Sequence, residues 1–560
     1  TTPSDDDDGT CSNGVVGIED SKGKVCCPLS CGECAGTGCS GSECCGGPIQ
    51  ASGIYCSDSL SSPCIIDVGV AATPAPASRT ATLSPSPVMT IPTSCGDDDT
   101  RPGFRFAAST GMSGRMYAEG SGCFTMTDLY NLDNGVSKGP VYVLDGTSKV
   151  EEPTEFTGKW LLEAELHITG GAIFYCMGTD IGGDCDELRI ESLGPDAWSR
   201  LPGFVRGHGG SMYFENTIVT SWDTPNGKPQ EEYEGGRSFL NCVSEFTDDQ
   251  TCEGNAKNDA GECRMDIINT EVGYLGYFDS ESYGLTYKVR GFCTDKSNPE
   301  VFDTTNVYGD IIGSDIHHNY YGHYSYGHQG GVWENNKMHD NHQYGFDPHD
   351  DSDYLTIANN LVYNNVNHGI IASKRCNNVK IYDNIVRDGG ELAAGIFLHR
   401  SSDQAEVFGN VIENMQDAGI AMLESMDAHI YDNTITGAKY GIRMSLGSAN
   451  NNIVDNTFTD ITHYGLYTYE GSDEPDVSNG RSSENTFTSN TVENCDIGVK
   501  IKEGDLNSFI DNTFINVNTF EFPDSTDTTW IGNMIDGGCI EEDDLDDLDL
   551  TDGSDEIPTC

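Results

Sequence analysis

An internal repeat in the second half of the chain constrains the fold more than any other feature of the sequence. An apolar residue followed three positions later by Asn recurs at steps of about 21 to 26 residues, with one longer step across the insertion "GSDEPDVSNGRS". The pairs are Trp333/Asn336, Ile357/Asn360, Ile381/Asn384, Val407/Asn410, Ile430/Asn433, Ile453/Asn456, Phe487/Asn490, Phe509/Asn512 and Trp530/Asn533. Repeats of this length that follow one another without interruption indicate a solenoid.

A second marker, a Gly followed by an alternating apolar segment, has the same period. It occurs at Gly322, Gly345, Gly369, Gly395, Gly419, Gly441, Gly465 and Gly498. Leucine-rich repeats have a similar period but need several Leu per repeat and a helical return segment, whereas these repeats are rich in Val, Ile, Asn and Thr. We therefore predict an all-β chain that forms a right-handed parallel β-helix, with the Asn positions as an internal ladder at a turn.

Composition restricts the partners of the protein. The 560 residues carry a formal net charge of -60, which would repel nucleic acids and anionic membrane surfaces. No apolar run approaches the roughly 18 residues that span a bilayer. We expect no nucleic-acid or membrane partner, and a monomer.

The cysteines point to an oxidising compartment. Ten of the 22 cysteines fall within the first 64 residues, where "CCPLSCGECAGTGCSGSECC" is too crowded and too poor in His for one tetrahedral zinc site. Disulfides are the favoured interpretation, with zinc as the alternative, and they indicate a secreted protein. The chain begins "TTPSDDDD", so we expect a secretory signal, if there was one, to be already removed.

Changes in composition predict five segments. They are a small disulfide-rich module at 1–64, a Pro/Ser/Thr linker at 65–94, an N-terminal part of the β-helix with insertions at 95–300, regular coils with the active site at 301–538, and an acidic tail at 539–560. The tail is best interpreted as a solvated charge run rather than a metal site.

The recurrent Gly also predicts which side chains point outward, because side chains in a strand alternate between its two faces. Positions one and three after the Gly are mostly apolar and should face the core, as in Ile370, Ala372, Ile396, Leu398, Ile420, Met422, Ile442 and Met444. In "YGFDPHD", residues 344 to 350, the same rule points Phe346 and Pro348 inward. Asp347 and His349 should then face solvent.

Stacked coils, about 4.8 Å apart, bring equivalent outward residues into columns. The predicted columns are Tyr326, His349, Ser373, His399 and Leu423; Tyr324, Asp347 and Arg443; and Asp350, Lys374 and Arg400. His342, His368 and Arg375 add to this face. Ordinary polar surface is the alternative, but so many His and cations in a chain with only 30 Lys and Arg favour a cleft that binds an extended polysaccharide.

These side chains suit the removal of a carbon-bound proton next to a carboxylate. The C5 hydrogen of a uronate is very weakly acidic, so Tyr or His must carry protons while Lys or Arg neutralises the carboxylate. Reprotonation from the opposite face inverts C5, whereas loss of the O4 substituent cleaves the polymer. Tyr344 also has a structural interpretation, because Tyr321, Tyr440 and Tyr464 precede their Gly in the same way and an aromatic stack at a turn would explain all four.

Three motifs on successive coils carry a family resemblance. "YGFDPHD" (344 to 350), "HGIIASKR" (368 to 375) and "AGIFLHRSSD" (394 to 403) resemble the mannuronan C5-epimerases of alginate biosynthesis, both the bacterial periplasmic enzymes and especially the brown-algal ones. The likeness covers roughly residues 100 to 540. It implies a secreted enzyme of the extracellular matrix or cell wall that converts β-D-mannuronate to α-L-guluronate residues in polymeric alginate.

The resemblance also assigns roles to residues. Tyr344, Asp347 and His349 match the motif that exchanges protons at C5, and His342 matches a second candidate base; the choice between His342 and His349 stays open. Lys374, Arg375, Arg400 and Lys288 are the candidates for neutralising the carboxylate, and His368, His399 and Tyr326 for binding the substrate.

Several alternatives stay open at this point. An alginate lyase on the same scaffold and a non-catalytic cell-wall polysaccharide-binding protein are the rival functions. No cofactor is required by the chemistry, although calcium could bridge the acidic surface and the polyanion. The Cys-rich module would serve either polysaccharide attachment or simple stabilisation and spacing.

Overall fold

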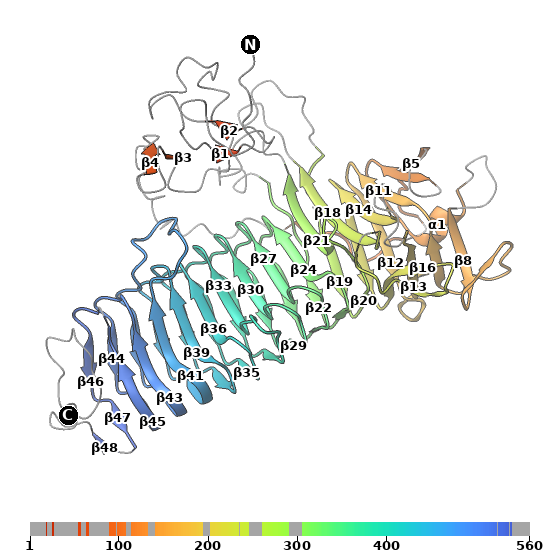
Figure 1. Ribbon diagram of the computed structural model, residues 1–560. Coiled ribbons are helices and arrows are strands. Elements are labelled where there is room, and N and C mark those ends of the chain that lie inside the picture. The colour runs from red at the N-terminus through yellow and green to blue at the C-terminus, as the bar shows by residue number, and fades with distance from the viewer. Residues whose placement is uncertain are drawn as a thin grey trace, which may run out of the picture. The chain divides into compact units, whose positions relative to one another are not determined.

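Short parallel strands dominate the computed structural model (Figure 1). It describes residues 89–96, 98–107, 114–132, 140–193, 202–234, 236–245, 260–279, 281–290, 305–523 and 525–536, and the backbone of five further short strands. Two compact units divide the chain: residues 1–82 with 472–477, and residues 83–471 with 478–560. The predicted Cys-rich module and acidic tail lie outside the described residues apart from strand backbone, and the segment boundaries stay predictions.

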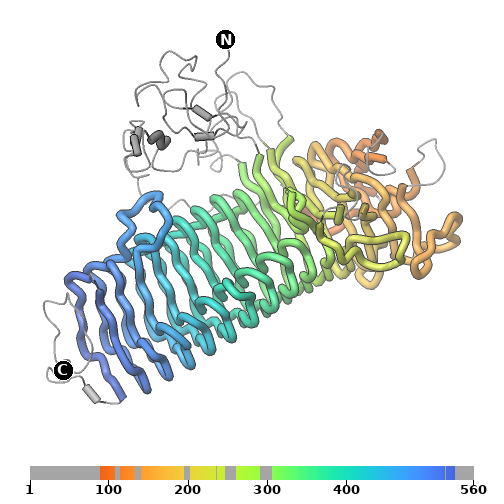
Figure 2. Tube along the Cα trace, in the orientation of Figure 1, coloured from red at the N-terminus to blue at the C-terminus, as the bar shows by residue number. Residues whose placement is uncertain are grey.

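The second unit is a parallel β-helix in which each regular coil contributes three strands. Successive coils follow one another along a single axis (Figure 2). The first stack is a 14-stranded sheet. Its strands are β7 (Gly122–Phe124), β12 (Ala172–Met177), β15 (Ser211–Glu215), β19 (Met265–Ile268), β22 (Ile311–Ile312), β25 (Val332–Glu334), β28 (Thr356–Ala358), β31 (Lys380–Tyr382), β34 (Glu406–Phe408), β37 (His429–Tyr431), β40 (Asn452–Val454), β42 (Thr486–Thr488), β44 (Ser508–Ile510) and β46 (Thr529–Ile531).

The other two stacks belong to one 30-stranded sheet. The second stack contains β10 (Lys159–Leu162), β13 (Glu187–Glu191), β16 (Ile218–Asp223), β20 (Glu271–Gly273), β23 (Asp315–His317), β26 (Lys337–His339), β29 (Leu361–Tyr363), β32 (Ile385–Arg387), β35 (Val411–Glu413) and β38 (Thr434–Thr436). The third stack contains β6 (Arg115–Glu119), β11 (Glu165–Thr169), β14 (Phe204–His208), β18 (Phe239–Glu245), β21 (Gly284–Arg290), β24 (Tyr321–Tyr326), β27 (Phe346–His349), β30 (Ile370–Ser373), β33 (Ile396–His399), β36 (Ala418–Leu423) and β39 (Tyr440–Ser445). In the last coils the two stacks merge into the long strands β41 (Thr457–Tyr469), β43 (Thr491–Ile501) and β45 (Thr513–Glu521), and the short β47 (Met534–Ile535) pairs with the start of β45.

A few elements stand outside this pattern. Antiparallel partners are β5 (Gly103–Ala107) on β6, β8 (Val141–Asp145) between β9 (Ser148–Val150) and β10, β17 (Lys228–Pro229) on β16, and β48 (Gly538–Cys539) on β47. In the first unit β1 (Ile18–Glu19) pairs with β2 (Val25–Cys26), and β3 (Ile54–Ser57) with β4 (Pro63–Ile66). The helices of the described part are α1 (Met126–Tyr130) and the 3₁₀ turn Thr179–Ile181, so none there could cross a membrane.

The interior is built as the Gly register predicts. The eight predicted inward residues of β30, β33, β36 and β39 are all buried in one apolar core, and Phe346 joins them beside Trp333. The recurrent Gly is needed for close backbone approach, because a Cβ at Gly345 would lie 2.4 Å from the carbonyl oxygen of Gly369. The alternate residues of each strand that point inward therefore form a continuous apolar interior along the β-helix.

The predicted Asn ladder is confirmed. From Asn336 to Asn533, each side-chain Nδ2 donates to Oδ1 of the next Asn at 2.9 to 3.0 Å, and each amide is buried. Shorter ladders that we did not predict run from Asn341 to Asn365 and from Asn451 through Asn485 to Asn507. Each amide thus satisfies polar backbone groups of the coil above or below it, which is why Asn recurs at a buried position.

Six of the described cysteines form disulfides, as predicted, at Cys95–Cys123, Cys176–Cys185 and Cys242–Cys263. All three lie in the first coils and the segment that leads into them. Two further described cysteines are buried free thiols, at Cys376 and Cys495. Crosslinks therefore gather where the repeat is irregular, while the regular coils are held by their ladders and core.

We predict that Asn384→Ala lowers the free energy of unfolding by about 3 kcal/mol or more. Its Nδ2 donates to Asn410 and to the Ile357 carbonyl, and its Oδ1 accepts from the backbone and side chain of Asn360, all at 2.9 to 3.0 Å. Alanine would leave several of these buried groups without partners. Chemical denaturation measures the loss. Asn518→Ala is the matched control, because that amide donates to Asp496 at the surface and should cost less than about 0.5 kcal/mol.

Candidate active site

The third stack brings most of the predicted site residues together on its outer face. Strand pairing aligns Tyr326 with His349, His349 with Ser373, and Ser373 with His399, as the predicted column requires. Tyr324 pairs with Asp347 in the same way. These residues lie on β24, β27, β30 and β33, which are consecutive in the stack (Figure 1).

The imidazole of His349 is oriented by a carboxylate. Its Nδ1 is hydrogen-bonded to Oδ2 of Asp350, and burial alone would raise the pKa of Asp350, but His349, Arg375 and Lys374 together lower it. A carboxylate can only accept, so Nδ1 carries the proton and Nε2 of the neutral ring keeps its lone pair. No partner of Nε2 is found within the described ranges. His349 can therefore accept a proton at Nε2.

Arg375 acts behind this pair rather than as an unpaired cation. Its Nη2 donates to Asp350 at 2.7 Å and its Nε to Asp351 at 3.0 Å. Asp351 is buried, and this burial raises its pKa to about 7 although Arg375 opposes the shift. The guanidinium thus fixes Asp350 on His349 and offsets part of the cost of burying Asp351.

Asp347 differs from our prediction in its burial. The strand alternation does place it on the outer face, but only 2% of its surface is exposed, and its Oδ1 has no hydrogen-bond partner. Burial raises the pKa values of Tyr283, Tyr321, Tyr324 and Tyr344, and the charge of Asp347 adds to each of these shifts. Burial raises the pKa of Asp347 to about 7, and His349 and Lys374 only partly oppose this shift.

Tyr344 satisfies both interpretations of its position. Its ring lies between Tyr321, at 5.3 Å between centroids, and His368, at 5.5 Å and nearly parallel, so the aromatic stack exists. Burial, with the charge of Asp347, raises the pKa of Tyr344 to about 12, so its hydroxyl stays protonated at neutral pH. Along the chain Tyr344 and His349 flank Asp347 on opposite sides.

The remaining candidates differ in their availability. His368 accepts the Ala394 amide at Nδ1 (3.0 Å), and burial lowers its pKa to about 3, so the ring is neutral. Nδ1 of His399 is hydrogen-bonded to Ser373, and Arg400 pairs with the buried Glu424 at 3.5 Å. Lys374 is half-buried, has no ion pair within the described part of the chain, and acts on Asp347 electrostatically.

His342 lies apart from this group, whereas Lys288 lies at its upstream edge, with its ammonium 5.8 Å from the centroid of the Tyr326 ring. The His342 ring stacks on Tyr233 at 3.7 Å and lies 5.2 Å from Tyr320; among the described residues no recorded hydrogen bond, ion pair or ring contact joins it to the other candidates. Burial lowers the pKa of His342. Lys288 aligns with Tyr326 one coil upstream and pairs with Glu281 at 3.4 Å.

The backbone conformation at the site explains why the hydrogen bonds of Arg375 to Asp350 and Asp351 could not be predicted from the sequence. Asp350, Asp351, Lys374, Arg375 and Arg400 all adopt positive φ, between 30° and 62°, immediately after their strands. Strand alternation no longer applies there, so side-chain directions cannot be counted from the Gly. Tyr283 and Tyr321, which we did not assign to the site, could have been found from the aromatic residues around Gly284 and Gly322. Tyr324 belongs to a column that we predicted, although we gave it no separate role.

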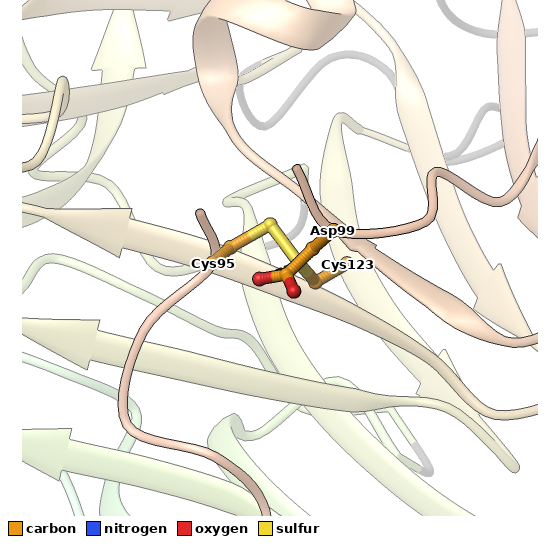
Figure 3. Close-up of side chains that lie close together, drawn as sticks. All are labelled: Cys95, Asp99 and Cys123. Atoms are coloured by element: carbon orange, nitrogen blue, oxygen red, sulfur yellow. Dashed lines mark hydrogen bonds between the residues drawn. A yellow bond between two sulfur atoms is a disulfide. The ribbon is translucent and has the colours of Figure 1, made fainter. Parts of the chain in front are cut away.

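Within the described ranges, one cluster has a composition suited to a metal ion, and it lies elsewhere. Cys95, Asp99 and Cys123 come together near the start of the second unit (Figure 3). Both sulfur atoms are joined in a disulfide, so neither is a thiolate ligand. This cluster does not fit a metal site.

We predict that Asp347→Asn stabilises the protein at alkaline pH and has little effect near pH 4. Because the folded pKa of about 7 exceeds the ordinary value of 3.8, the folded state holds a proton that the unfolded state loses, and stability falls as pH rises between these values. Asparagine avoids that loss, which is on the order of 1 to 4 kcal/mol above pH 7. Thermal unfolding between pH 4 and pH 8 measures the difference.

Asp505→Asn is the control of opposite sign. Its hydrogen bonds from Arg481 lower the pKa of Asp505, so this variant should lose stability at neutral pH. If Asp347→Asn changed the unfolding temperature by the same amount at every pH, the Asp347 carboxyl would not be a buried group with a raised pKa.

Similarity to known proteins agrees with the fold and the motifs. Residues 297–435 and 371–482 match the family model described as right handed beta helix region. The chain is 29% identical over 274 residues to the mannuronan C5-epimerase of Pseudomonas putida, covering 47% of this chain and 46% of that protein. It is 30% identical over 304 residues to the mannuronan C5-epimerase AlgG of Azotobacter vinelandii, covering 53% of this chain and 51% of that protein.

A solved structure extends the likeness to more of the chain. The periplasmic alginate epimerase AlgG superposes with a TM-score of 0.54 and 20% identity, covering 75% of this chain and 85% of that chain. The chain spans about half the length of the two sequence relatives. Together these similarities confirm the right-handed parallel β-helix and the resemblance of the chain to the mannuronan C5-epimerases.

Proposed function

We propose that the protein is a C5-epimerase that converts β-D-mannuronate to α-L-guluronate residues within polymeric alginate. The observation that carries the proposal is His349, whose Nδ1 is bound to Asp350 while Nε2 is left able to accept a proton. The names of the similar proteins, which are mannuronan C5-epimerases, support the same reaction. Disulfides in the first coils support an extracellular location, in the matrix or cell wall.

In the first step His349 acts as the base. Nε2 takes the C5 proton, and the C–H electron pair passes into the substrate carboxylate to give an enolate-like intermediate. The imidazolium that forms is stabilised by Asp350, which Arg375 holds in place. His342 lacks a comparable carboxylate in the described structure, so we assign it no proton transfer.

Asp347 and Lys374 neutralise the substrate carboxylate. A carboxyl with a pKa of about 7 is partly protonated at neutral pH, so Asp347 can donate a hydrogen bond to a carboxylate where an ionised Asp would repel it. Lys374 supplies the positive charge. Both act more strongly as negative charge grows on the carboxylate in the transition state.

Tyr344 completes the inversion. A sugar ring above Asp347 would have His349 on one side and Tyr344 on the other, so the Tyr344 hydroxyl can donate its proton to C5 from the opposite face. Its raised pKa makes the tyrosinate a strong base that regains a proton from solvent, while His349 releases one. In the rival lyase reaction the same hydroxyl would protonate O4 and the polymer would be cleaved.

The reaction is tested on polymannuronate. We expect a new guluronate anomeric signal by NMR without unsaturated chain ends. Ultraviolet absorbance from a C4–C5 double bond would instead show a lyase, and binding without either product would favour the polysaccharide-binding protein. The same assay with a chelator tests whether calcium is needed, which we propose only as an aid to binding between the acidic protein and the polymer.

We predict that His349→Gln lowers kcat by about 100- to 10 000-fold, the usual contribution of a general base. His342→Gln is the matched control, and it should keep most of the wild-type rate because its ring packs on Tyr233 and Tyr320. Initial rates of guluronate formation measure both variants. The reverse ranking would move the base to His342 and overturn the assignment of His349.

A further inference from the structure

Four tyrosines lie on the same stack beyond the candidate active site and have no part in the proposed reaction. They are Tyr440 on β39 and Tyr464, Tyr467 and Tyr469 on β41. Ring centroids lie 5.5 Å apart for Tyr440 and Tyr464, 4.7 Å for Tyr464 and Tyr467, and 4.8 Å for Tyr467 and Tyr469. All four are half-buried, so part of each ring reaches solvent. With Arg443 we call them the tyrosine platform.

Arg443 places a fixed positive charge within the platform. One guanidinium nitrogen pairs with Asp417 at 2.9 Å and another donates to the Tyr469 hydroxyl at 2.7 Å. Its Nε is buried without a partner. Arg443 also lowers the pKa of His368 through its charge, after the larger effect of burial, so its field reaches the candidate active site.

The platform continues the face that carries the site. β27 pairs with β30, β30 with β33, β33 with β36, and β36 with β39. This series leads in four steps from the coil of Asp347 to the coil of Arg443. Pairing of β39 with β41 then sets Tyr467 directly beside Arg443. Four steps of about 4.8 Å put Arg443 about 19 Å from Asp347 along the axis. Each sugar of an extended polyuronate advances the polymer by a distance comparable to the spacing of two adjacent coils.

Cations gather at the platform in a chain that has few of them. The Lys439 ammonium lies 4.9 Å from the Tyr440 centroid, and that of Lys500 lies 5.0 Å from the Tyr464 centroid. An aromatic ladder on the first stack, formed by Tyr382, Phe408 and Tyr431, has the same ring stacking, but it lies on another face. Ring stacking is thus a general feature of the coils, and an arginine beside a ring also occurs on the second stack, at Arg387 and Tyr363. What distinguishes the platform is that it continues the face that carries the candidate active site.

We propose that the tyrosine platform binds the polyuronate chain about four to five sugar residues away from the residue that reacts. The tyrosine rings pack on the apolar faces of the sugars, and Arg443 pairs with a uronate carboxylate. The proposal rests on the proposed function for the identity of the polymer. It makes efficient turnover depend on polymer length, because a short oligomer in the active site cannot reach Arg443.

The test compares kcat/KM for long polymannuronate with that for oligomers too short to span both regions. We expect the wild-type protein to favour the long polymer. In Tyr467→Ala and Arg443→Gln this ratio should fall by about tenfold, through KM rather than kcat, as loss of one charged or aromatic contact implies. Tyr431→Ala, which removes a ring from the first stack, is the control and should leave the ratio unchanged.

Affinity electrophoresis through polymannuronate separates this proposal from the proposed function, because it needs no turnover. If the wild-type protein forms no guluronate but Tyr467→Ala and Arg443→Gln weaken its binding to the polymer, the proposal for the tyrosine platform stands and the proposed epimerase function is wrong. Epimerisation with the same length dependence in both variants and the wild type would overturn the platform. Arg443→Gln leaves all the rings in place, so its result holds even if Tyr467→Ala does not fold.

Discussion

The stacking of coils at strand spacing is the constraint on which the rest of the molecule depends. Each Asn within the ladder is held by the coil above and the coil below, so an error of one residue in any of these coils would leave buried amides without partners. The ladder therefore fixes the register of all three stacks at once. Columns of outward side chains follow from it, including the one that aligns Tyr326, His349, Ser373 and His399.

This regularity also explains the unusual electrostatics of the candidate site. Asp347 faces outward and is nevertheless almost fully buried, and its charge adds to the effect of burial on the pKa values of Tyr321, Tyr324 and Tyr344. Burial then raises the pKa of Asp347 to about 7, while Asp350, only three residues later, has a lowered pKa because Arg375 and His349 lie against it. The pKa values of two neighbouring carboxyl groups are thus shifted in opposite directions, a pattern typical of acid and base assignments.

The sequence predicted what depends on period and alternation, and missed what depends on turns. The ladder, the inward positions and the column of His349 all follow from counting residues after a Gly. The burial of Asp347 could not be predicted in this way, because strand alternation gives the face on which a side chain lies but not what covers it. The contacts of Arg375 could not be predicted by counting residues either, because the positive φ values of Lys374 and Arg375 turn the chain away from strand geometry. The packing of His342 on Tyr233 required a segment more than a hundred residues distant in the sequence.

The net charge of -60 raises a physical difficulty for a polyanionic partner, and the arrangement of the cations addresses it. Surface charges act over roughly 10 Å or less at moderate ionic strength, so a polymer on one face responds to the groups beneath it more than to the total charge. On the third stack, Asp350 and Asp351 are paired with Arg375, Asp417 with Arg443, and Glu521 with Lys500. Pairing reduces local repulsion without removing the N–H donors that a carboxylate can use. A protein of this composition can therefore bind a uronate polymer through a face whose acids are already neutralised, while its remaining surface stays strongly acidic.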